Sequence, residues 1–182
     1  MSKYILFLSF ISAFIRFPCL LGDFVFDDKV AIVNNKDVFN ISESWIKVFE
    51  HDFWGYNLTS TSHKSYRPFT ILTFRWNGLV STQAFGFHAV NIIFHVLNCN
   101  LVLKILKCYF NIKIATIASL IFAVHPCHTE AVCGVVGRAD ILWSFMALIS
   151  IYLRKLFKNL VVKFSRKFCT SIFGKVGPRS KD

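Results

Sequence analysis

The 182-residue sequence has no CxxC pair, no internal repeat and few acidic residues. Its cysteines are scattered, at positions 19, 99, 108, 127, 133 and 169, and half of them fall within or beside hydrophobic runs. This distribution does not predict a disulfide framework, although Cys127 and Cys133 are candidates for a single disulfide. The same segment carries His125, His128 and Glu130, but their spacing matches no regular zinc motif. We therefore predict no metal site.

Acidic residues number only 10 against 21 lysines and arginines, which gives a formal net charge of +11. The excess is concentrated after residue 153, where nine bases face the single acid Asp182. Nucleic-acid binding would need aromatic residues interleaved with bases on an accessible surface, so we predict no nucleic-acid partner. Bases beside hydrophobic spans are instead typical of the cytosolic flanks of a membrane protein.

Polar residues are also too few for a soluble domain of this length. Hydrophobic residues make up 54% of the chain, the mean hydropathy is +0.51 and there are 21 phenylalanines. A soluble domain of this size could not bury that much apolar surface, so lipid is the expected solvent. The composition predicts an α-class, multi-span helical membrane protein with membrane lipid as a partner.

About four apolar runs are candidate spans, at Tyr4–Leu21, 87–106, 114–124 and 141–153. Lys3 precedes the first run and no A-x-A-like cleavage site precedes Gly22, which favours an uncleaved signal-anchor with a cytosolic N-terminus over a cleaved signal peptide. The last run has 13 residues, about 20 Å of helix against roughly 30 Å of hydrocarbon. Arg138 and Asp140 just before it are therefore expected within the membrane's depth, where both need partners.

The spans divide the chain into four predicted parts. These are the first span (1–21), a long lumenal loop (22–85), three further spans joined by a second lumenal segment (86–153) and a basic cytosolic tail (154–182). The tail alternates basic and apolar residues and is expected to be solvated or to lie on the membrane surface, not to form another span.

Polar residues recur at helical spacing inside the second span, at His88, Asn91, His95 and Asn98. Polar groups are costly in lipid, so this face should contact protein or a water-filled cavity. Interhelical hydrogen bonding is the favoured explanation, ahead of catalysis.

The loop 22–85 is expected to have its own structure. Asn40 is a candidate cap for an amphipathic helix lying in the membrane interface, whose apolar face would consist of Ile41, Trp45, Val48, Phe49 and Phe53. Asn40-Ile-Ser and Asn57-Leu-Thr are sequons for N-glycosylation, which fit a lumenal address.

An acidic pair, Asp27 and Asp28, ends the run Phe24-Val-Phe-Asp-Asp28 just after the first span. A carboxylate there could deprotonate a hydroxyl nucleophile or help to hold a metal. Adjacent acids are also frequent on solvated loops, but this pair lies between apolar residues, which is not typical of a fully solvent-exposed loop.

Two further segments carry cations. Ser62-His-Lys-Ser-Tyr-Arg-Pro68 offers Lys64 and Arg67 to an anion, and Arg67 could grip phosphate with two hydrogen bonds; a basic loop on lipid headgroups fits equally well. Gly134-Val-Val-Gly-Arg-Ala-Asp140 follows the histidine cluster. Its glycines allow close backbone approach to a ligand, beside the positive charge of Arg138.

These segments, in this order and spacing, resemble the membrane domain of the transmembrane and tetratricopeptide repeat-containing proteins. The matching text is Phe24-Val-Phe-Asp-Asp28, Asp52-Phe-Trp-Gly55, Ser62-His-Lys-Ser-Tyr-Arg-Pro68, His125-Pro-Cys-His-Thr-Glu-Ala-Val132 and Val136-Gly-Arg-Ala-Asp140. The resemblance covers roughly residues 22–153, and the motifs are long enough to be specific.

The resemblance implies a GT-C glycosyltransferase of the endoplasmic reticulum membrane. Such an enzyme moves mannose from dolichyl phosphate mannose to Ser or Thr of secretory-pathway proteins, notably cadherins. It implies that Asp27 and Asp28 are catalytic, one accepting the proton of the acceptor hydroxyl. Arg67, Arg138 and Lys64 are the candidates to hold the donor phosphate, and no cofactor is implied.

The sequence also departs from the family pattern. A GT-C transferase needs about twice as many spans, the family adds tetratricopeptide repeats, and neither is present. We therefore expect a partial GT-C membrane domain, an N-terminal part that is inactive alone. The alternative is a non-catalytic, truncated membrane protein that acts as an assembly or interaction partner.

Overall fold

The computed structural model describes residues 1–40, 42, 44–59, 62 and 64–173, the last nine of these by their backbone only. Over these residues the protein is all-helical, apart from an isolated bridge between His51 and Asn57. The elements in chain order are α1 (Ser2–Arg16), η1 (Phe17–Leu21), η2 (Lys29–Val33), α2 (Lys36–Phe39), η3 (Trp45–Phe49), α3 (Pro68–Val80), α4 (Ala84–Leu106), α5 (Ile112–Val124), η4 (Pro126–His128), α6 (Thr129–Cys133) and α7 (Arg138–Phe173).

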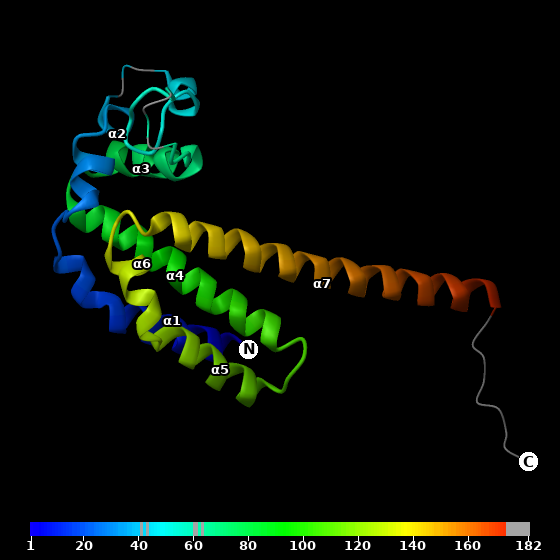
Figure 1. Ribbon diagram of the computed structural model, residues 1–182. Helices are drawn as coiled ribbons and strands as arrows, with labels where there is room; N and C mark the ends of the chain where they lie inside the picture. The colour runs from blue at the N-terminus through cyan, green and yellow to red at the C-terminus, as the bar shows by residue number, and fades with distance from the viewer. Residues whose placement is uncertain (41, 43, 60–61, 63, 174–182) are drawn as a thin grey trace, which may run out of the picture.

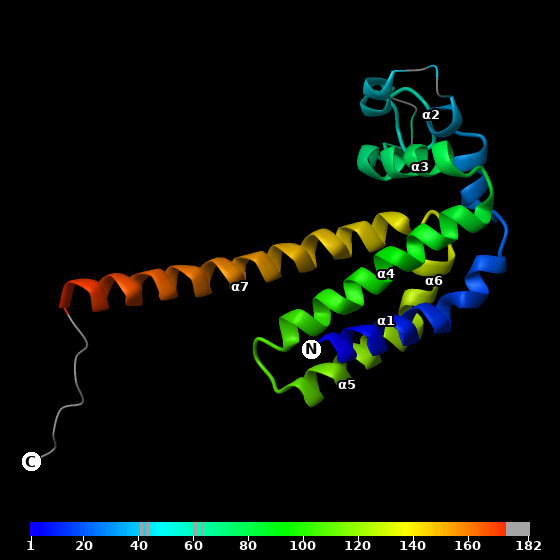
Figure 2. The same ribbon diagram turned by 180° about the vertical axis from the view of Figure 1, so that it is seen from behind.

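Helices α1, α4 and α5 lie side by side and form what we call the bundle (Figures 1 and 2). They meet around a core of Leu8, Leu103 and three small residues, Cys99, Ala115 and Ala123, and the small residues let the helices approach closely. Two helices in the described part are long and apolar enough to cross a membrane, Ser2–Leu21 and Ala84–Leu106. A third span results if Ile112–Val124 and Pro126–Cys133, which meet at a bend of 48°, act together. Four spans were predicted, but only two or three are candidates by length and composition. Helix α7 is not among them.

The polar stripe of α4 faces protein, as predicted. His88, Asn91, His95 and Asn98 are all buried. Asn98 Nδ2 donates to the carbonyl of Ile141 at 3.0 Å, which joins α4 to α7. His95 Nε2 lies 3.2 Å from the carbonyl of Ala123 in α5. The prediction of interhelical hydrogen bonding is therefore confirmed for His95 and Asn98, whereas the ring nitrogens of the buried His88 have no hydrogen-bond partner among the described residues.

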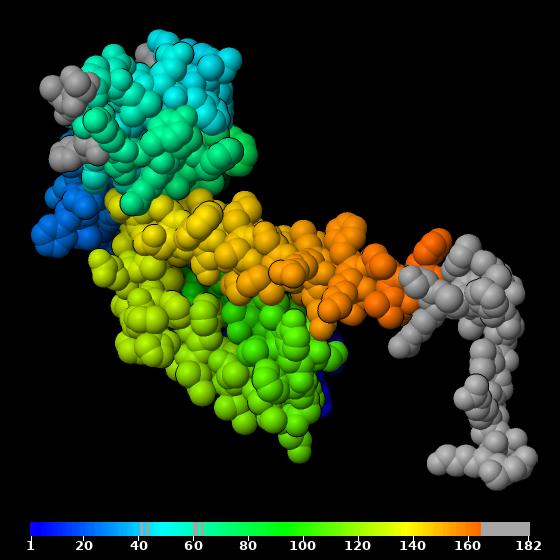
Figure 3. Space-filling model, turned by 45° about the vertical axis from the view of Figure 1, so that its right-hand side comes forward, coloured from blue at the N-terminus to red at the C-terminus, as the bar shows by residue number. Residues whose placement is uncertain are grey.

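Residues 24–80 fold into a separate lobe above one end of the bundle, which we call the cap (Figures 1 and 3). Its core consists of Ala31, Ile32, Val38, Val48, Phe53, Ile71 and Phe74, and it is completed by Phe87 and Val135. Polar groups buried in the cap have local partners. His51 Nδ1 lies 2.8 Å from the Asp37 carboxylate, and Asn35 Nδ2 donates to the carbonyl of Phe53.

The predicted amphipathic helix capped by Asn40 is wrong. A short 3-10 helix, η3, begins one turn later under the cap of Ser44, whose Oγ accepts from the amide of Ile46. Asn40 instead ends α2, and Ile41 lies outside the described residues. The longer helix of the cap is α3, which begins at Pro68, a residue favoured in the first turn because it needs no amide partner.

Helix α7 runs without a break through the predicted end of the fourth apolar run at residue 153 and into the basic tail. Between Arg138 and Phe173 the sequence has no glycine or proline, and lysine, arginine and leucine are good helix formers, so nothing local stops the helix. Its 36 residues correspond to about 54 Å. In Figures 1 and 2 the helix diverges from α1, α4 and α5.

Candidate functional site

The acidic pair lies where the cap joins the bundle, and its two carboxylates have different surroundings. Asp28 is buried: its Oδ1 accepts from the amide of Val136 at 2.8 Å and its Oδ2 from the amide of Val25 at 3.3 Å. It therefore ties together two of the predicted motifs, which are 108 residues apart in sequence. The acidic motif and the segment around Val136 therefore lie side by side in the structure.

Asp27 is exposed, and no hydrogen bond or ion pair is found for its carboxylate among the described residues. It follows Phe26, which is 91% exposed and has a φ of 45°, a left-handed conformation that is uncommon for a bulky residue. Adjacent residues in this turn thus present one carboxylate to the interior and one to the outside. Backbone conformations as uncommon as that of Phe26 cluster at functional sites.

A disulfide between Cys19 and Cys133 holds the same junction. It joins η1, six residues before Val25, to the end of α6, three residues before Val136. The suggested pairing of Cys127 with Cys133 is wrong, because Cys127 is free and exposed. Spacing could not identify the true partner, since 114 residues separate the two cysteines and only the fold brings them together.

Arg138 is completely buried at the start of α7 and binds the protein itself. Its guanidinium donates to Asn91 Oδ1 at 2.7 Å, to Asn77 Oδ1 at 2.9 Å and to the carbonyls of Phe87 and Thr73. The charge also lies 4.6 Å from the ring centroid of Phe74. This placement favours a role in positioning α3, α4 and α7 over direct contact with a phosphate.

Asn91 extends this network to the acidic pair. Its Nδ2 lies within hydrogen-bonding distance of three carbonyls at the end of α6 and in the turn that follows, those of Val132, Gly134 and Val135. The next residue along the chain supplies the amide that Asp28 binds. A continuous path of hydrogen bonds and backbone therefore runs from Arg138 through Asn91 to Asp28.

The other two predicted cations are accessible. Lys64 and Arg67 are both exposed, and the Arg67 guanidinium lies 5.1 Å from the ring centroid of Phe53. In the part of the chain that is described, no ion pair joins either of them to the acidic pair. Arg67 lines a cavity of about 890 Å³ between α3 and α7. Aromatic and aliphatic side chains form most of its wall, including Phe69, Trp76 and Trp143.

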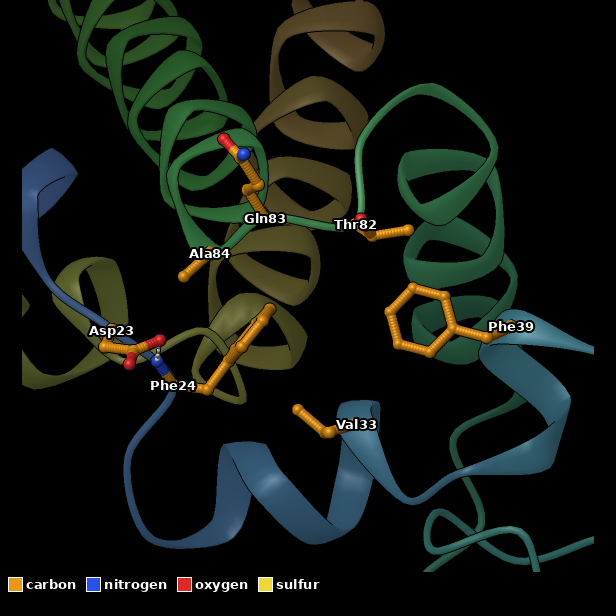
Figure 4. A pocket seen from close by; sticks show the side chains of 7 residues that line it. All are labelled: Asp23, Phe24, Val33, Phe39, Thr82, Gln83 and Ala84. Carbon is orange, nitrogen blue, oxygen red and sulfur yellow. Dashed lines mark hydrogen bonds between the residues drawn. The ribbon is translucent and has the colours of Figure 1, made fainter.

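A second hollow, of about 500 Å³, adjoins the segment that carries the acids. Figure 4 shows Phe24, Val33 and Phe39 around it, with Thr82 and Gln83 on the turn that precedes α4. Asp23 stands at its edge and accepts from the amide of Phe24 at 2.7 Å. Both hollows have polar side chains in their lining: Asp23, Thr82 and Gln83 here, and Arg67, Thr73 and Asp140 in the cavity between α3 and α7.

The histidine segment 125–130 also has local structural contacts. His125 Nδ1 accepts from the amide of Cys127 and caps η4. Arg16, which interrupts the first apolar run, is buried and donates to Thr129 Oγ1 at 2.6 Å and to the carbonyl of His125 at 3.0 Å. A lone arginine at the end of an apolar run was the available signal, since such a charge needs a partner.

The fold and site define an all-helical protein with two or three candidate membrane spans, a folded cap and a candidate active site where the cap joins the bundle. Comparison with known proteins is more specific. The chain is 49% identical over 131 residues to protein O-mannosyl-transferase TMTC3 of Homo sapiens, and 50% identical over 136 residues to TMTC1 of Mus musculus. A Caenorhabditis elegans protein O-mannosyl-transferase, F38B6.6, is 43% identical over 154 residues. The chain is a homologue of the TMTC protein O-mannosyl-transferases over this segment.

These matches cover 71%, 72% and 80% of this chain but only 14%, 14% and 22% of the three relatives. The chain therefore spans about a fifth or less of the length of the curated relatives that it matches. No family model matches the sequence, and no solved structure matches it either.

Proposed function

We propose that this chain forms part of a GT-C protein O-mannosyltransferase of the endoplasmic reticulum membrane, with Asp27 as the catalytic base. The proposed reaction moves mannose from dolichyl phosphate mannose to Ser or Thr of secretory-pathway proteins such as cadherins. The observation that carries the proposal is the exposed Asp27 carboxylate beside an anchored Asp28, in a chain homologous to O-mannosyl-transferases.

The two acids have separate tasks in this proposal. Asp27 accepts the proton of the acceptor hydroxyl while the oxygen of that hydroxyl attacks the anomeric carbon of mannose. The bond from that carbon to the donor phosphate breaks, and dolichyl phosphate leaves with the electron pair. Asp28 has its oxygens occupied by two backbone amides, so it orients the turn that carries Asp27.

The two hollows suit the two substrates. The apolar cavity between α3 and α7 is a candidate for the first isoprene units of the donor, with Arg67 available to its phosphate. The hollow at Asp23 and Gln83 has the polar rim that a peptide acceptor needs. Arg138 serves the reaction indirectly, through Asn91 and the turn that binds Asp28.

The proposed topology places the cap in the lumen and the N-terminus in the cytosol. Both sequon asparagines, Asn40 and Asn57, are exposed, and the cystine next to the cap fits an oxidising compartment. The proposed topology also needs α7 to cross back to the cytosol, although length and composition alone do not mark this helix as a span. Lys155 Nζ lies 4.4 Å from the ring centroid of Tyr109, in the turn between α4 and α5, which puts residue 155 level with the far end of the bundle.

The test uses cells that lack the endogenous TMTC enzymes. They would be complemented with human TMTC3 in which the homologous segment is replaced by that of this chain, and mannose on a cadherin acceptor would be measured by mass spectrometry. We expect Asp27→Asn to lower transfer by about 10²–10⁴-fold at unchanged protein level, the range for loss of a general base. Asp28→Asn should lower both transfer and the amount of folded protein.

Glu50→Gln is the matched control, because Glu50 is an exposed acid of the cap outside both hollows. It should leave transfer unchanged. Full activity of the Asp27→Asn protein would refute the assignment of the base. If the unsubstituted chimera is made and folded but transfers no mannose, the proposed function itself is refuted for this segment.

A further inference from the structure

The second half of α7 extends beyond the bundle. Two contacts mark where the bundle ends along this helix: Lys155 with the ring of Tyr109, and Lys104 Nζ, 5.9 Å from the ring centroid of Tyr152. Past this level α7 continues through Phe164 and leaves the bundle obliquely (Figures 1 and 3). We call residues 154–164 the distal segment.

Basic and apolar side chains of the distal segment lie on opposite sides of the helix. With about 100° between successive residues, Arg154, Lys155, Lys158 and Lys163 fall within one half of the circumference. Leu156, Phe157, Leu160 and Val161 fall within the other half, and only Val162 departs from the pattern. The helix is therefore amphipathic. The alternation of basic and apolar residues in the sequence did not predict this property, because it did not predict a helix here.

The apolar side is uncovered. Its four side chains are between 39% and 67% exposed, whereas an amphipathic helix in water normally buries such a face. The chain contains no acidic residue between Asp140 and Asp182, so no intrahelical ion pair neutralises the bases. Lys104, Lys107 and Lys113 add positive charge at the same end of the bundle.

We infer that the distal segment binds the anionic surface of the cytosolic leaflet. Its apolar side enters the boundary between headgroups and acyl chains, and its four bases bind phospholipid phosphates and carboxylates. Lipid fits better than a protein partner because the segment starts where the bundle reaches the membrane surface, and because it combines an apolar side with uncompensated basic charge. The inference depends on the cytosolic position of residue 155 and not on any catalytic activity.

The experiment measures the depth of residue 160 in vesicles. The full chain, with Cys108, Cys127 and Cys169 changed to Ser and Leu160 to Cys, would carry an environment-sensitive nitrobenzoxadiazole label. It would be reconstituted in phosphatidylcholine with or without phosphatidylserine. We expect blue-shifted emission and strong quenching by brominated lipid with phosphatidylserine, weaker signals without it, and a decline with added salt.

Charge variants separate a lipid site from a general apolar contact. Since each base near the surface counts about equally, Lys155→Gln, Lys158→Gln and Lys163→Gln together should weaken the surface-bound state by roughly a hundredfold. The matched triple change to Arg keeps the charge and should retain binding. Emission typical of water in both lipids would overturn the inference. The inference would also be overturned if the label at residue 160 were buried equally with and without phosphatidylserine and in the Gln variants, and if energy transfer occurred between labelled copies. A second chain would then cover the segment.

Discussion

The cap and the bundle have interiors of different composition. In the cap the apolar core is aromatic and aliphatic, centred on Phe53 and Phe74, and buried polar groups such as Asn35 and His51 have partners within the cap. In the bundle the interior holds Ser12, Asn98 and Ser119, while Phe10, Phe14, Ile117 and Ile121 point outward. The first arrangement is that of a protein in water, and the second is that of helices in lipid.

The contrast shows that one short chain is folded for two solvents. In lipid, apolar side chains gain little from being inside, so small residues and interhelical hydrogen bonds hold the helices together. In water the same side chains must be covered. The junction between the two regions is the place where the candidate active site lies, and it is held by Arg138, the Cys19–Cys133 disulfide and Asp28.

The largest expected effect comes from breaking the junction itself. Arg138→Leu would leave the side-chain oxygens of Asn77 and Asn91 buried without their donor, so we expect the free energy of unfolding to fall by about 3–5 kcal/mol. Thermal unfolding and limited proteolysis of the purified chain in detergent micelles would measure the change. Arg67→Leu is the matched control, since Arg67 is exposed, and it should cost less than about 1 kcal/mol. Similar stabilities for both variants would contradict the junction role.

The same substitution at two similarly exposed positions, one in the bundle and one in the cap, compares lipid with water as the surrounding solvent. Ile117 in α5 is 60% exposed and Ile46 in the cap is 71% exposed. Ile117→Asp should cost about 3 kcal/mol in a membrane, because it sets a charge against lipid, whereas Ile46→Asp should stay within about 0.5 kcal/mol. Membrane insertion and yield of folded protein in vesicles are the measurements. Equal tolerance at both positions would show that the outer face of α5 does not contact lipid.

The third prediction concerns the cystine, whose expected effect is similar in size to that of Ile117→Asp. Cys133→Ser should lower the free energy of unfolding by about 2–4 kcal/mol, the usual contribution of a disulfide that closes a long loop. Cys127→Ser should change little because Cys127 is free and exposed. Labelling with a thiol-specific mass tag after unfolding, combined with thermal unfolding, would report both the bond and the stability. A free Cys19 in the unsubstituted protein from microsomes would exclude the disulfide.

The bundle was predictable because its signals are local. Apolar runs longer than ten residues define α1, α4 and α5, and polar residues at helical spacing identify the buried face of α4. The position of the acidic pair after the first span follows from the same pattern. The cap was less predictable, since aromatic residues around position 45 fit an amphipathic helix as well as the short η3 that forms.

The different roles of the two acids could not be predicted from the sequence. Nothing near Asp27 or Asp28 tells which one is buried, because the decisive partner, the amide of Val136, comes from the far end of the chain. The same holds for Arg138, whose four acceptors lie on α3 and α4. The length of α7 was not predicted either. The charge pattern suggested a tail after residue 153, although the backbone continues as a helix to Phe173.

The distance along the chain between Asp28 and Val136 also sets an order of events during synthesis. A ribosome adds about 5–20 residues per second, so the 108 residues between them take about 5–20 s to make. During that time the acidic turn has left the ribosome without the amide that fixes it. The site is therefore assembled late, after α4, α5 and α6 have been inserted. A nascent chain halted before residue 133 would carry both acids without the amide that binds Asp28.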